Sequence, residues 1–314
     1  MLTQRSIVLL GATGFVGHHL LPRLAADGHR LTLLTRNRTR HRELALVPGI
    51  RLVDTHVHDV QVLTERFRGA DVVINLVGIL NEQGGQTFDA VHVRLAQTVI
   101  RACQQAGVAR LHQMSSLKAG AAASAYLRSR GAAEDAVRIS GLDWTIYRPS
   151  VIFGPGDGLV SRFHKLLRTM PVLPLARAGA RMAPVFVGDV ADAVARCVGD
   201  GDLARNRCLE LPGPDTLRLG EIVTRIRDAA GLRRAVIALP DPLGWLQAAI
   251  AGLLPGKPFS LDNFRSLGVD SVSGQDGLGE LGITPLRLST WLAEYFHPDN
   301  RQALLDRLRR AHPR

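Results

Sequence analysis

The chain has 314 residues, of which 46% are hydrophobic and 21% charged, with 39 basic against 28 acidic side chains. This composition is typical of a water-soluble globular protein that is long enough for two domains. It excludes a transmembrane helix, because no run of about 18 uncharged apolar residues occurs, and the early apolar strand leaves no room for a signal peptide. Three widely spaced cysteines fit no zinc or redox motif. We therefore expect reduced thiols in a cytoplasm, with a position peripheral to the inner membrane as the alternative.

The first predicted element is an apolar strand at 7–10 that runs directly into a glycine-rich turn and an amphipathic helix. Gly11 allows a sharp turn, Gly14 lets the backbone approach a pyrophosphate, and Gly17 allows close packing of the helix on the sheet. The helix N-terminus presents unpaired N–H groups and a partial positive charge to a diphosphate. The residues assigned to this dinucleotide loop are Gly11, Thr13, Gly14, Phe15, Val16 and Gly17.

The end of the second predicted strand, at 31–35, bears on the choice of nicotinamide coenzyme. An acidic residue there would bind the ribose 2′-hydroxyl, whereas a basic residue suits a 2′-phosphate. The following segment contains Arg36 and Arg38 and no carboxylate, so it favours NADP(H), with NAD(H) as the alternative. The competing interpretation is that these arginines face solvent and bind nothing.

Strands and helices alternate through the first half of the chain. Further strands are predicted at 50–53, 71–77, 108–114 and 143–147, and helices at 14–27, 88–106 and 124–140. This alternation predicts an α/β protein with a doubly wound parallel sheet, the Rossmann fold. We expect an NAD(P)-binding domain over 1–153. The later segment 183–200 would also belong to this domain, with 205–212 as an optional addition. A smaller mixed substrate domain would comprise 154–182 and 213–314.

The second half alternates less regularly. Helices are predicted at 159–168 and 219–230, and short irregular pieces at 171–184. The stretch 243–254 is unusually apolar for an exposed helix. We interpret it first as a lid or wall packed on the substrate cleft and second as a peripheral membrane contact, which would require flanking basic residues.

Several segments carry a resemblance to a known family, namely 11–17, 71–78, 126–134, 148–154 and 184–191. On these segments the chain resembles the extended and atypical short-chain dehydrogenases/reductases of the NAD-dependent epimerase/dehydratase superfamily. It is most similar to the group that includes the NADPH-binding accessory subunit of respiratory complex I. The resemblance implies further cofactor contacts from His56, Val57, Leu76, Val77, Gly78, Ser115, Pro149, Val151 and Phe153.

The resemblance also implies a Tyr-x-x-x-Lys pair on the helix after the fifth strand, and Tyr126 and Arg130 occupy these positions. Such a tyrosine exchanges the proton that accompanies hydride transfer, while a neighbouring cation stabilises its phenolate and binds the nicotinamide ribose. Arginine keeps the charge but cannot release a proton, so cofactor binding should survive this replacement better than catalysis. Ser116 is the candidate for carbonyl polarisation, although strict alignment puts Leu117 at that position.

Other family positions also depart from the pattern. His92 replaces an asparagine on the preceding helix, and His56 replaces an aspartate that meets adenine. His56 and His58 form His-x-His, but no third ligand has metal spacing, so no metal site is predicted.

Three functions remain open. The first is an NADP(H)-dependent oxidoreductase or epimerase-like enzyme acting on an unidentified carbonyl or quinone-type small molecule. The second is a catalytically weak NADPH-binding accessory or assembly protein with a respiratory-chain or quinone-related partner. The third is RNA binding, which rests only on the net charge of +11, concentrated at 36–42, 225–234 and 301–314. Nucleic acid is the least favoured partner, because no nucleic-acid motif accompanies the charge.

Overall fold

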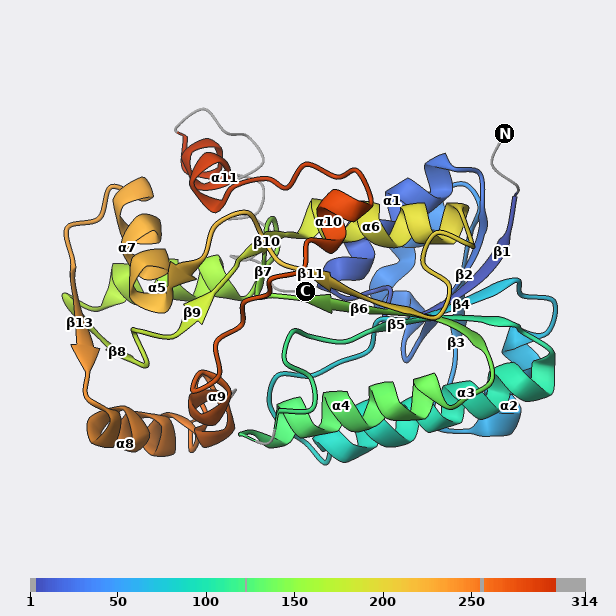
Figure 1. Ribbon diagram of the computed structural model, residues 1–314, viewed down its shortest axis with the longest axis horizontal. Coiled ribbons are helices and arrows are strands. Elements are labelled where there is room, and N and C mark those ends of the chain that lie inside the picture. Colours follow the sequence, from blue (N-terminus) through green and yellow to red (C-terminus); the bar gives the residue numbers. More distant parts are fainter. Residues whose placement is uncertain (1–3, 122, 255–256, 298–314) are drawn as a thin grey trace.

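The computed structural model describes residues 4–121, 123–254 and 257–297. The basic stretch at 301–314 lies outside these described residues. Within them the chain forms a larger lobe, built around one sheet with helices on both faces, and a smaller lobe beside it (Figure 1). No helix of the described residues is long and apolar enough to cross a bilayer.

Seven parallel strands form the central sheet, which confirms the predicted fold class. In spatial order they are β11 (Arg207–Leu211), β6 (Asp143–Pro149), β5 (Arg110–Met114), β4 (Val72–Asn75), β1 (Ser6–Leu10), β2 (Arg30–Thr35) and β3 (Ile50–Asp54). The inner strands β1 and β4 are almost wholly buried, as parallel strands covered on both faces require. The chain order reverses between them, so the sheet has a switch point at the carboxyl ends of β1 and β4, where ligands bind in such folds.

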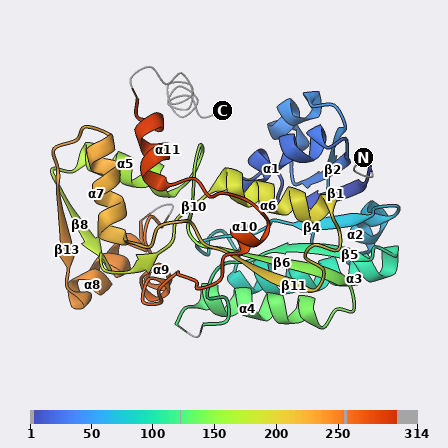
Figure 2. The same ribbon diagram turned by 45° about the horizontal axis from the view of Figure 1, so that its top comes forward.

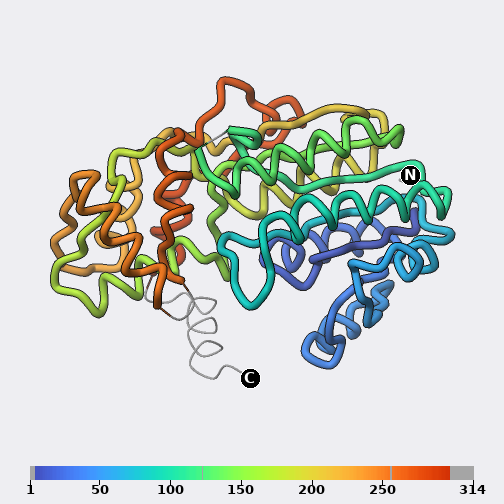
Figure 3. The backbone as a smooth tube through the Cα atoms, turned by 90° about the horizontal axis from the view of Figure 1, so that it is seen from below, coloured from blue at the N-terminus to red at the C-terminus, as the bar shows by residue number. Residues whose placement is uncertain are grey.

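Helices cover both faces of the sheet. One face carries α1 (Phe15–Ala26) and α6 (Val187–Gly199), and the other carries α2 (Val60–Phe67), α3 (Leu95–Ala106) and α4 (Ala125–Arg138). Helices α3 and α4 lie side by side (Figure 3). The helix predicted at 88–106 begins as a π-helical turn, η2 (Asp89–Arg94), and ends at Gly107, whose φ is +75°.

The smaller lobe has its own apolar core, which contains Phe153, Ile222 and Trp291. Its helices are α5 (Leu159–Thr169), α7 (Leu219–Ala229), α8 (Asp241–Ala251), α9 (Leu261–Ser266) and α11 (Leu288–Tyr295). Helix α11 packs against α7 (Figure 2). The remaining short elements are η1 (Arg38–Leu46), β7 (Ile152–Phe153), β9 (Arg181–Met182), β10 (Val185–Phe186), β12 (Leu217–Arg218) and α10 (Gly277–Glu280).

The expectation of irregular pieces at 171–184 is wrong in part. That segment contains β8 (Val172–Ala176), which pairs in parallel with β13 (Ala235–Leu239). Prolines at 171 and 174 hide the strand pattern in the sequence, but a two-stranded ribbon tolerates proline because one edge of β8 is unpaired. The segment 207–211, whose sheet the sequence left open, pairs with β6 as the edge strand β11.

Candidate functional site

The glycine loop after β1 lies against the chain that leaves β4. Gly11 has a φ of +74°, and a Cβ on it would lie 2.8 Å from the backbone nitrogen of Val77. A Cβ on Gly17 would overlap the backbone of Ala12. Only glycine fits these two positions, while Gly14 is exposed on the outer side of the loop. The inner side of the loop is therefore closely packed against the protein, and its outer side is open to solvent. A loop that binds a diphosphate needs both features.

Three further residues belong to the glycine loop. Thr13, Phe15 and Val16 are half-buried. The ring of Phe15 meets that of His19 edge-on, with 5.7 Å between the ring centroids. The Nε2 atom of His19 lies 3.0 Å from the carbonyl oxygen of Pro155. This contact connects the N-terminal part of α1 to the loop after β7.

Tyr126 and Arg130 lie one turn apart on α4, at the carboxyl ends of β4 and β5. The guanidinium carbon of Arg130 lies 5.5 Å from the centre of the Tyr126 ring. Arg130 Nη1 donates to the carbonyl oxygen of Met114 at 3.1 Å, and its Nη2 occupies the space that a Cβ on Gly78 would need. Because the glycine loop contacts the residues just before Gly78, one short segment joins that loop to the tyrosine–arginine pair.

Two buried polar atoms in this region have no hydrogen-bond partner in the described part of the chain. They are Arg130 Nε and Ser116 Oγ. The hydroxyl of Tyr126 also has no partner among the described residues. Because buried polar groups in native proteins are nearly always hydrogen-bonded, the two buried atoms mark a place that fits a polar ligand. Together with the glycine loop, they fit a nicotinamide coenzyme and a substrate.

His92 lies beneath Tyr126 and connects α4 to the segment after β4. Its Nε2 accepts the backbone N–H of Ile79 at 3.2 Å, and its Nδ1 lies 2.8 Å from Ser129 Oγ. Ser129 Oγ donates to the carbonyl oxygen of Tyr126 at 2.8 Å. This pattern assigns the proton to Nδ1 of a neutral ring. Burial, and less strongly the charge of Arg130, lower the pKa of His92 to about 2, so this side chain is a fixed link and not a titrating base.

Two buried histidines make stability depend on pH. Burial lowers the pKa of His92 to about 2 and that of His112 to about 3. Below about pH 6.5 the unfolded chain then binds more protons than the folded chain, so the free energy of unfolding falls as the pH falls. Each histidine should contribute about 1.4 kcal/mol in total between about pH 7.5 and about pH 5.5. Urea unfolding at both pH values measures this change.

The variant His92→Asn should remove about 1.4 kcal/mol of the stability lost between about pH 7.5 and about pH 5.5. The exposed His58 provides the matched control variant, His58→Asn. The same loss of stability in His92→Asn as in the parent chain would show that His92 is not held neutral in the folded protein.

The two arginines predicted to bind a 2′-phosphate have different surroundings. The backbone N–H of Arg38 donates to Asp54 Oδ1 at 2.6 Å, and Arg38 Nε lies 3.4 Å from the other oxygen of the same carboxylate. Arg36 is exposed, and its guanidinium has no partner among the described residues. Arg36 is thus the more available cation at the end of β2.

The segment after β3 is open to solvent. His56 and His58 are exposed, and Val57 is half-buried against the core beneath α2. Asp59 caps α2 through hydrogen bonds from the backbone N–H groups of Gln61 and Val62 at 2.9 and 3.1 Å. Among the described residues, no group of three or more His, Cys, Asp or Glu side chains is placed to hold a metal ion.

The other predicted contacts fall into two groups. Leu76, Val77 and Val151 are half-buried and Gly78 is exposed, all near the carboxyl ends of the strands. The hydroxyl of Ser115, in contrast, donates to the buried Glu134 at 2.5 Å. The remaining three residues are buried in the protein, namely Leu117, Pro149 and Phe153. The ring of Phe153 packs against those of Phe186 and Trp291, with ring centroids 5.7 and 5.6 Å away.

The sequence reasoning missed Asp262 in α9. Its two carboxylate oxygens accept the backbone N–H groups of Ala125 at 2.7 Å and Tyr126 at 3.1 Å. A carboxylate in this position satisfies unpaired donors and interacts favourably with the helix dipole. The smaller lobe therefore holds the first turn of the helix that carries Tyr126. No local signal points to this contact, because its partners are 136 residues apart.

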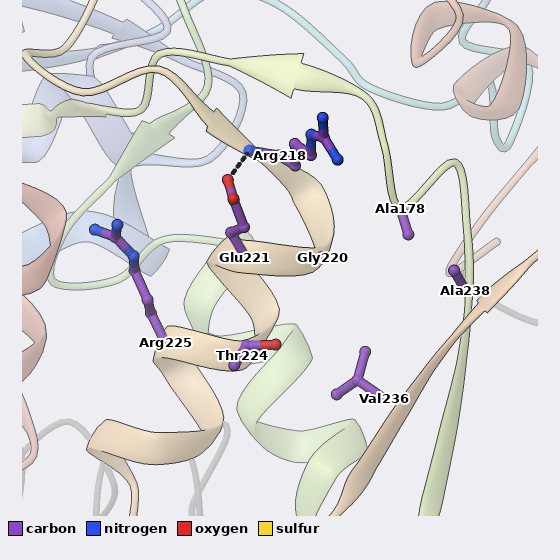
Figure 4. Close-up of a pocket in the computed structure, with 8 residues that line it drawn as sticks. All are labelled: Ala178, Arg218, Gly220, Glu221, Thr224, Arg225, Val236 and Ala238. Atoms are coloured by element: carbon purple, nitrogen blue, oxygen red, sulfur yellow. Dashed lines mark hydrogen bonds between the residues drawn. The ribbon is translucent and has the colours of Figure 1, made fainter.

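A surface pocket lies between α7 and β13, and its lining includes none of the predicted site residues (Figure 4). The side chain of Arg225 points away from Val236 and Ala238. Glu221 accepts the backbone N–H of Arg218 at 2.7 Å and so caps α7. This pocket is separate from the region around Tyr126.

Comparisons with known proteins match a nucleotide-binding family to the part of the chain that contains the glycine loop and Tyr126. The profile of a family described as NAD(P)H-binding matches residues 11–164. The chain is 32% identical over 245 residues to a ceramide reductase of Caulobacter vibrioides, covering 75% of this chain and 74% of that protein. It is 28% identical over 305 residues to the mitochondrial NADH dehydrogenase (ubiquinone) 1 alpha subcomplex subunit 9 of Arabidopsis thaliana, covering 91% and 76%. The NADPH complex of the quinone oxidoreductase QOR2 from Escherichia coli has the same fold, with a TM-score of 0.77 at 19% identity over 93% of this chain and 100% of that one.

Proposed function

The chain belongs to the NAD(P)H-binding family of short-chain dehydrogenase/reductase-like proteins, and from that premise we propose that it is an NADP(H)-dependent oxidoreductase. Its substrate class would be a carbonyl or quinone-type small molecule. The observation that carries this proposal is the position of Tyr126 and Arg130 at the switch point of the sheet. There the segment after β4, which the glycine loop contacts, also lies against Arg130, and the Tyr126 ring lies beside a guanidinium with an unpartnered nitrogen.

The coenzyme would lie across the carboxyl ends of β1 and β4. Backbone N–H groups of the loop around Gly14 would bind the diphosphate, and Arg36 would pair with the 2′-phosphate. When bound, the coenzyme supplies or accepts the hydride. Arg130 would donate to the nicotinamide ribose from the side of its guanidinium group that lies beside Gly78.

Tyr126 would exchange a proton with the substrate oxygen through its hydroxyl. The guanidinium of Arg130 stabilises the phenolate that forms when the tyrosine gives up this proton. His92 and Ser129 hold the backbone carbonyl of Tyr126, and Asp262 holds its backbone N–H. These contacts keep the phenol in one position while substrate enters and product leaves.

A steady-state assay of NADPH oxidation tests the proposal directly. The purified protein should oxidise NADPH in the presence of decylubiquinone or 2-octanone, at a rate that saturates with both reactants. The absence of turnover with a broad panel of quinones and ketones, in protein that binds NADPH, would refute the enzyme and favour the second candidate below.

Arg36 should decide the choice between the two coenzymes. We expect Arg36→Ala to weaken NADPH binding about 10- to 100-fold, because a charge-assisted contact worth about 1.5–3 kcal/mol is lost. Its NADH affinity should stay unchanged, since NADH has no 2′-phosphate. Arg38→Ala is the matched control, and its effect should be smaller because Asp54 already pairs with that side chain. Calorimetric titration of each variant with both coenzymes measures the difference, and equal losses for both coenzymes would contradict this role.

We propose as a second candidate a catalytically weak NADPH-binding accessory protein for a respiratory or quinone-related assembly. Two features of this chain favour it. Arg130 stands where the family has lysine, and the apolar Leu117, only 2% exposed, stands where the family has a serine. The similarity to a complex I subunit supports such a partner. In this case NADPH would stay bound through purification without being oxidised by added quinones or ketones.

A further inference from the structure

The outward side of α8 and of the turn that follows it is apolar. Six large apolar side chains there are between 48% and 87% exposed, namely Leu243, Trp245, Leu246, Ile250, Leu253 and Leu254. We call this set the α8 face. Within 241–251 the only polar side chains are Asp241 and Gln247. A contiguous exposed apolar surface of this kind marks an interaction site in a folded protein.

The helix is held with this face outward by contacts on its other side. Gly244 and Ala248 are its buried residues, and a Cβ on Gly244 would lie 3.0 Å from both Ala176 and Phe264. Gln247 fixes the helix to β8, because its Nε2 donates to the carbonyl oxygen of Pro174 at 2.8 Å. Its Oε1 also accepts the backbone N–H of Ala176 at 3.2 Å. The apolar side of this helix is therefore exposed in the structure.

Two segments of the smaller lobe near α8 are basic. Helix α8 packs on β8, and β8 pairs with β13, so the segments 159–177 and 232–261 form one part of this lobe. These two segments contain seven basic residues and one acidic residue, which gives a formal charge of +6. The basic residues are Arg162, Lys165, Arg168, Arg177, Arg233, Arg234 and Lys257. The single acid, Asp241, already pairs with Arg177 at 3.0 Å.

This positive charge favours one kind of binding partner for the α8 face over another. A second copy of the chain would bring another lobe with the same positive charge against the first, and like charges oppose that contact. An anionic bilayer would attract the lobe, while aliphatic side chains and a tryptophan enter the boundary between headgroups and acyl chains. The flanking basic residues that such a contact needs come from α5 and from Arg233 and Arg234 just before β13, since α8 itself has no Lys or Arg.

We propose that the α8 face docks the smaller lobe onto an anionic membrane surface, with α8 lying in the plane of that surface. Helix α9 packs against α8 and also holds the first turn of α4 through Asp262. Docking therefore places the element that supports Tyr126 next to the bilayer. The proposal does not depend on the coenzyme or on turnover.

Vesicle flotation of the full chain tests this proposal. The protein should float with phosphatidylcholine vesicles that contain about 30% phosphatidylglycerol, and much less with phosphatidylcholine alone. Raising the salt from about 0.05 M to about 0.5 M should weaken the binding, because salt screens the attraction. Fluorescence of Trp245 should shift to shorter wavelength with anionic vesicles, and Trp245→Phe should remove that shift.

Charge substitutions on the α8 face give the sharpest comparison. Ile250→Glu should reduce the vesicle-bound fraction about tenfold or more. The matched control is Ile139→Glu at the C-terminal end of α4, because Ile139 is equally apolar and 86% exposed but lies outside the α8 face. Both variants should keep the circular dichroism spectrum and NADPH affinity of the parent chain. The proposal is overturned if the parent does not bind anionic vesicles or if Ile250→Glu binds as well as Ile139→Glu. It is equally overturned if the face proves to be covered by a concentration-dependent dimer that Ile250→Glu dissociates.

Discussion

Replacing Tyr126 with phenylalanine is expected to lower turnover about 10²- to 10⁴-fold while NADPH affinity stays within about twofold. The change removes only the hydroxyl, which has no partner among the described residues and is therefore free for a substrate oxygen. The ring stays in contact with Phe88 and His92, whose centroids lie 5.8 and 5.6 Å from its own. Steady-state oxidation of NADPH with decylubiquinone, combined with calorimetric titration of NADPH, separates the two effects.

Tyr295→Phe is the matched control for this variant. Tyr295 lies in α11, in the core of the smaller lobe, so the loss of its hydroxyl should leave turnover within about twofold. Retention of full turnover by Tyr126→Phe would show that this phenol carries no proton in the reaction. A matching fall in both turnover and NADPH affinity would show a structural role for its hydroxyl.

Glu134→Gln is expected to lower the free energy of unfolding by about 1.5–3 kcal/mol, because charge-assisted hydrogen bonds to a buried carboxylate are lost. Glu134 lies on α4, is fully buried, and accepts Arg148 Nη2 at 2.6 Å and Arg138 Nη2 at 2.7 Å. Its other oxygen accepts Ser115 Oγ. The neutral amide would remove the buried negative charge that both guanidinium groups contact, leaving Arg148 paired only with Glu210 at 3.3 Å and Arg138 only with Asp135 at 3.1 Å. Removing one partner of a buried ion pair costs far more than the intact pair contributes.

The neighbouring Asp135 provides the control on the same helix. Asp135 also pairs with Arg138, at 3.1 Å, but its side chain is 76% exposed. Asp135→Asn should therefore change the free energy of unfolding by less than about 1 kcal/mol. Urea unfolding of both variants at neutral pH makes the comparison. Equal stability of the two variants would mean that Glu134 is not the centre of a buried charge network.

The parts of the molecule that the sequence predicts well depend on neighbouring residues in the chain. The strand before Gly11, the glycine spacing and the following helix form one continuous segment, so its pattern specifies the turn and the first crossover. The alternation of apolar strands with helices likewise predicts the parallel sheet, because each buried strand must be apolar along its whole length. The spacing of Tyr126 and Arg130 on one helix predicts that they share a face.

The parts that the sequence does not reveal depend on contacts between distant segments. Asp262 holds the first turn of α4 from the other lobe, and no pattern near either partner indicates it. Ser115 was assigned to the coenzyme, whereas its hydroxyl bonds to Glu134, a contact that follows only from the packing of α4 on β5 and β6. The apolar composition of α8 is plain in the sequence. Which side of that helix faces solvent is decided by Gly244 and Gln247 against β8.

The central claim is that the switch point between β1 and β4 binds a nicotinamide coenzyme beside Tyr126. Thermal unfolding of the purified full chain, followed during titration with NADPH, tests this claim most directly. At NADPH concentrations about 100 times the dissociation constant, the folded protein should gain about 2.7 kcal/mol, and the unfolding temperature should rise accordingly. An unfolding temperature that stays the same at every NADPH and NADH concentration would contradict the claim.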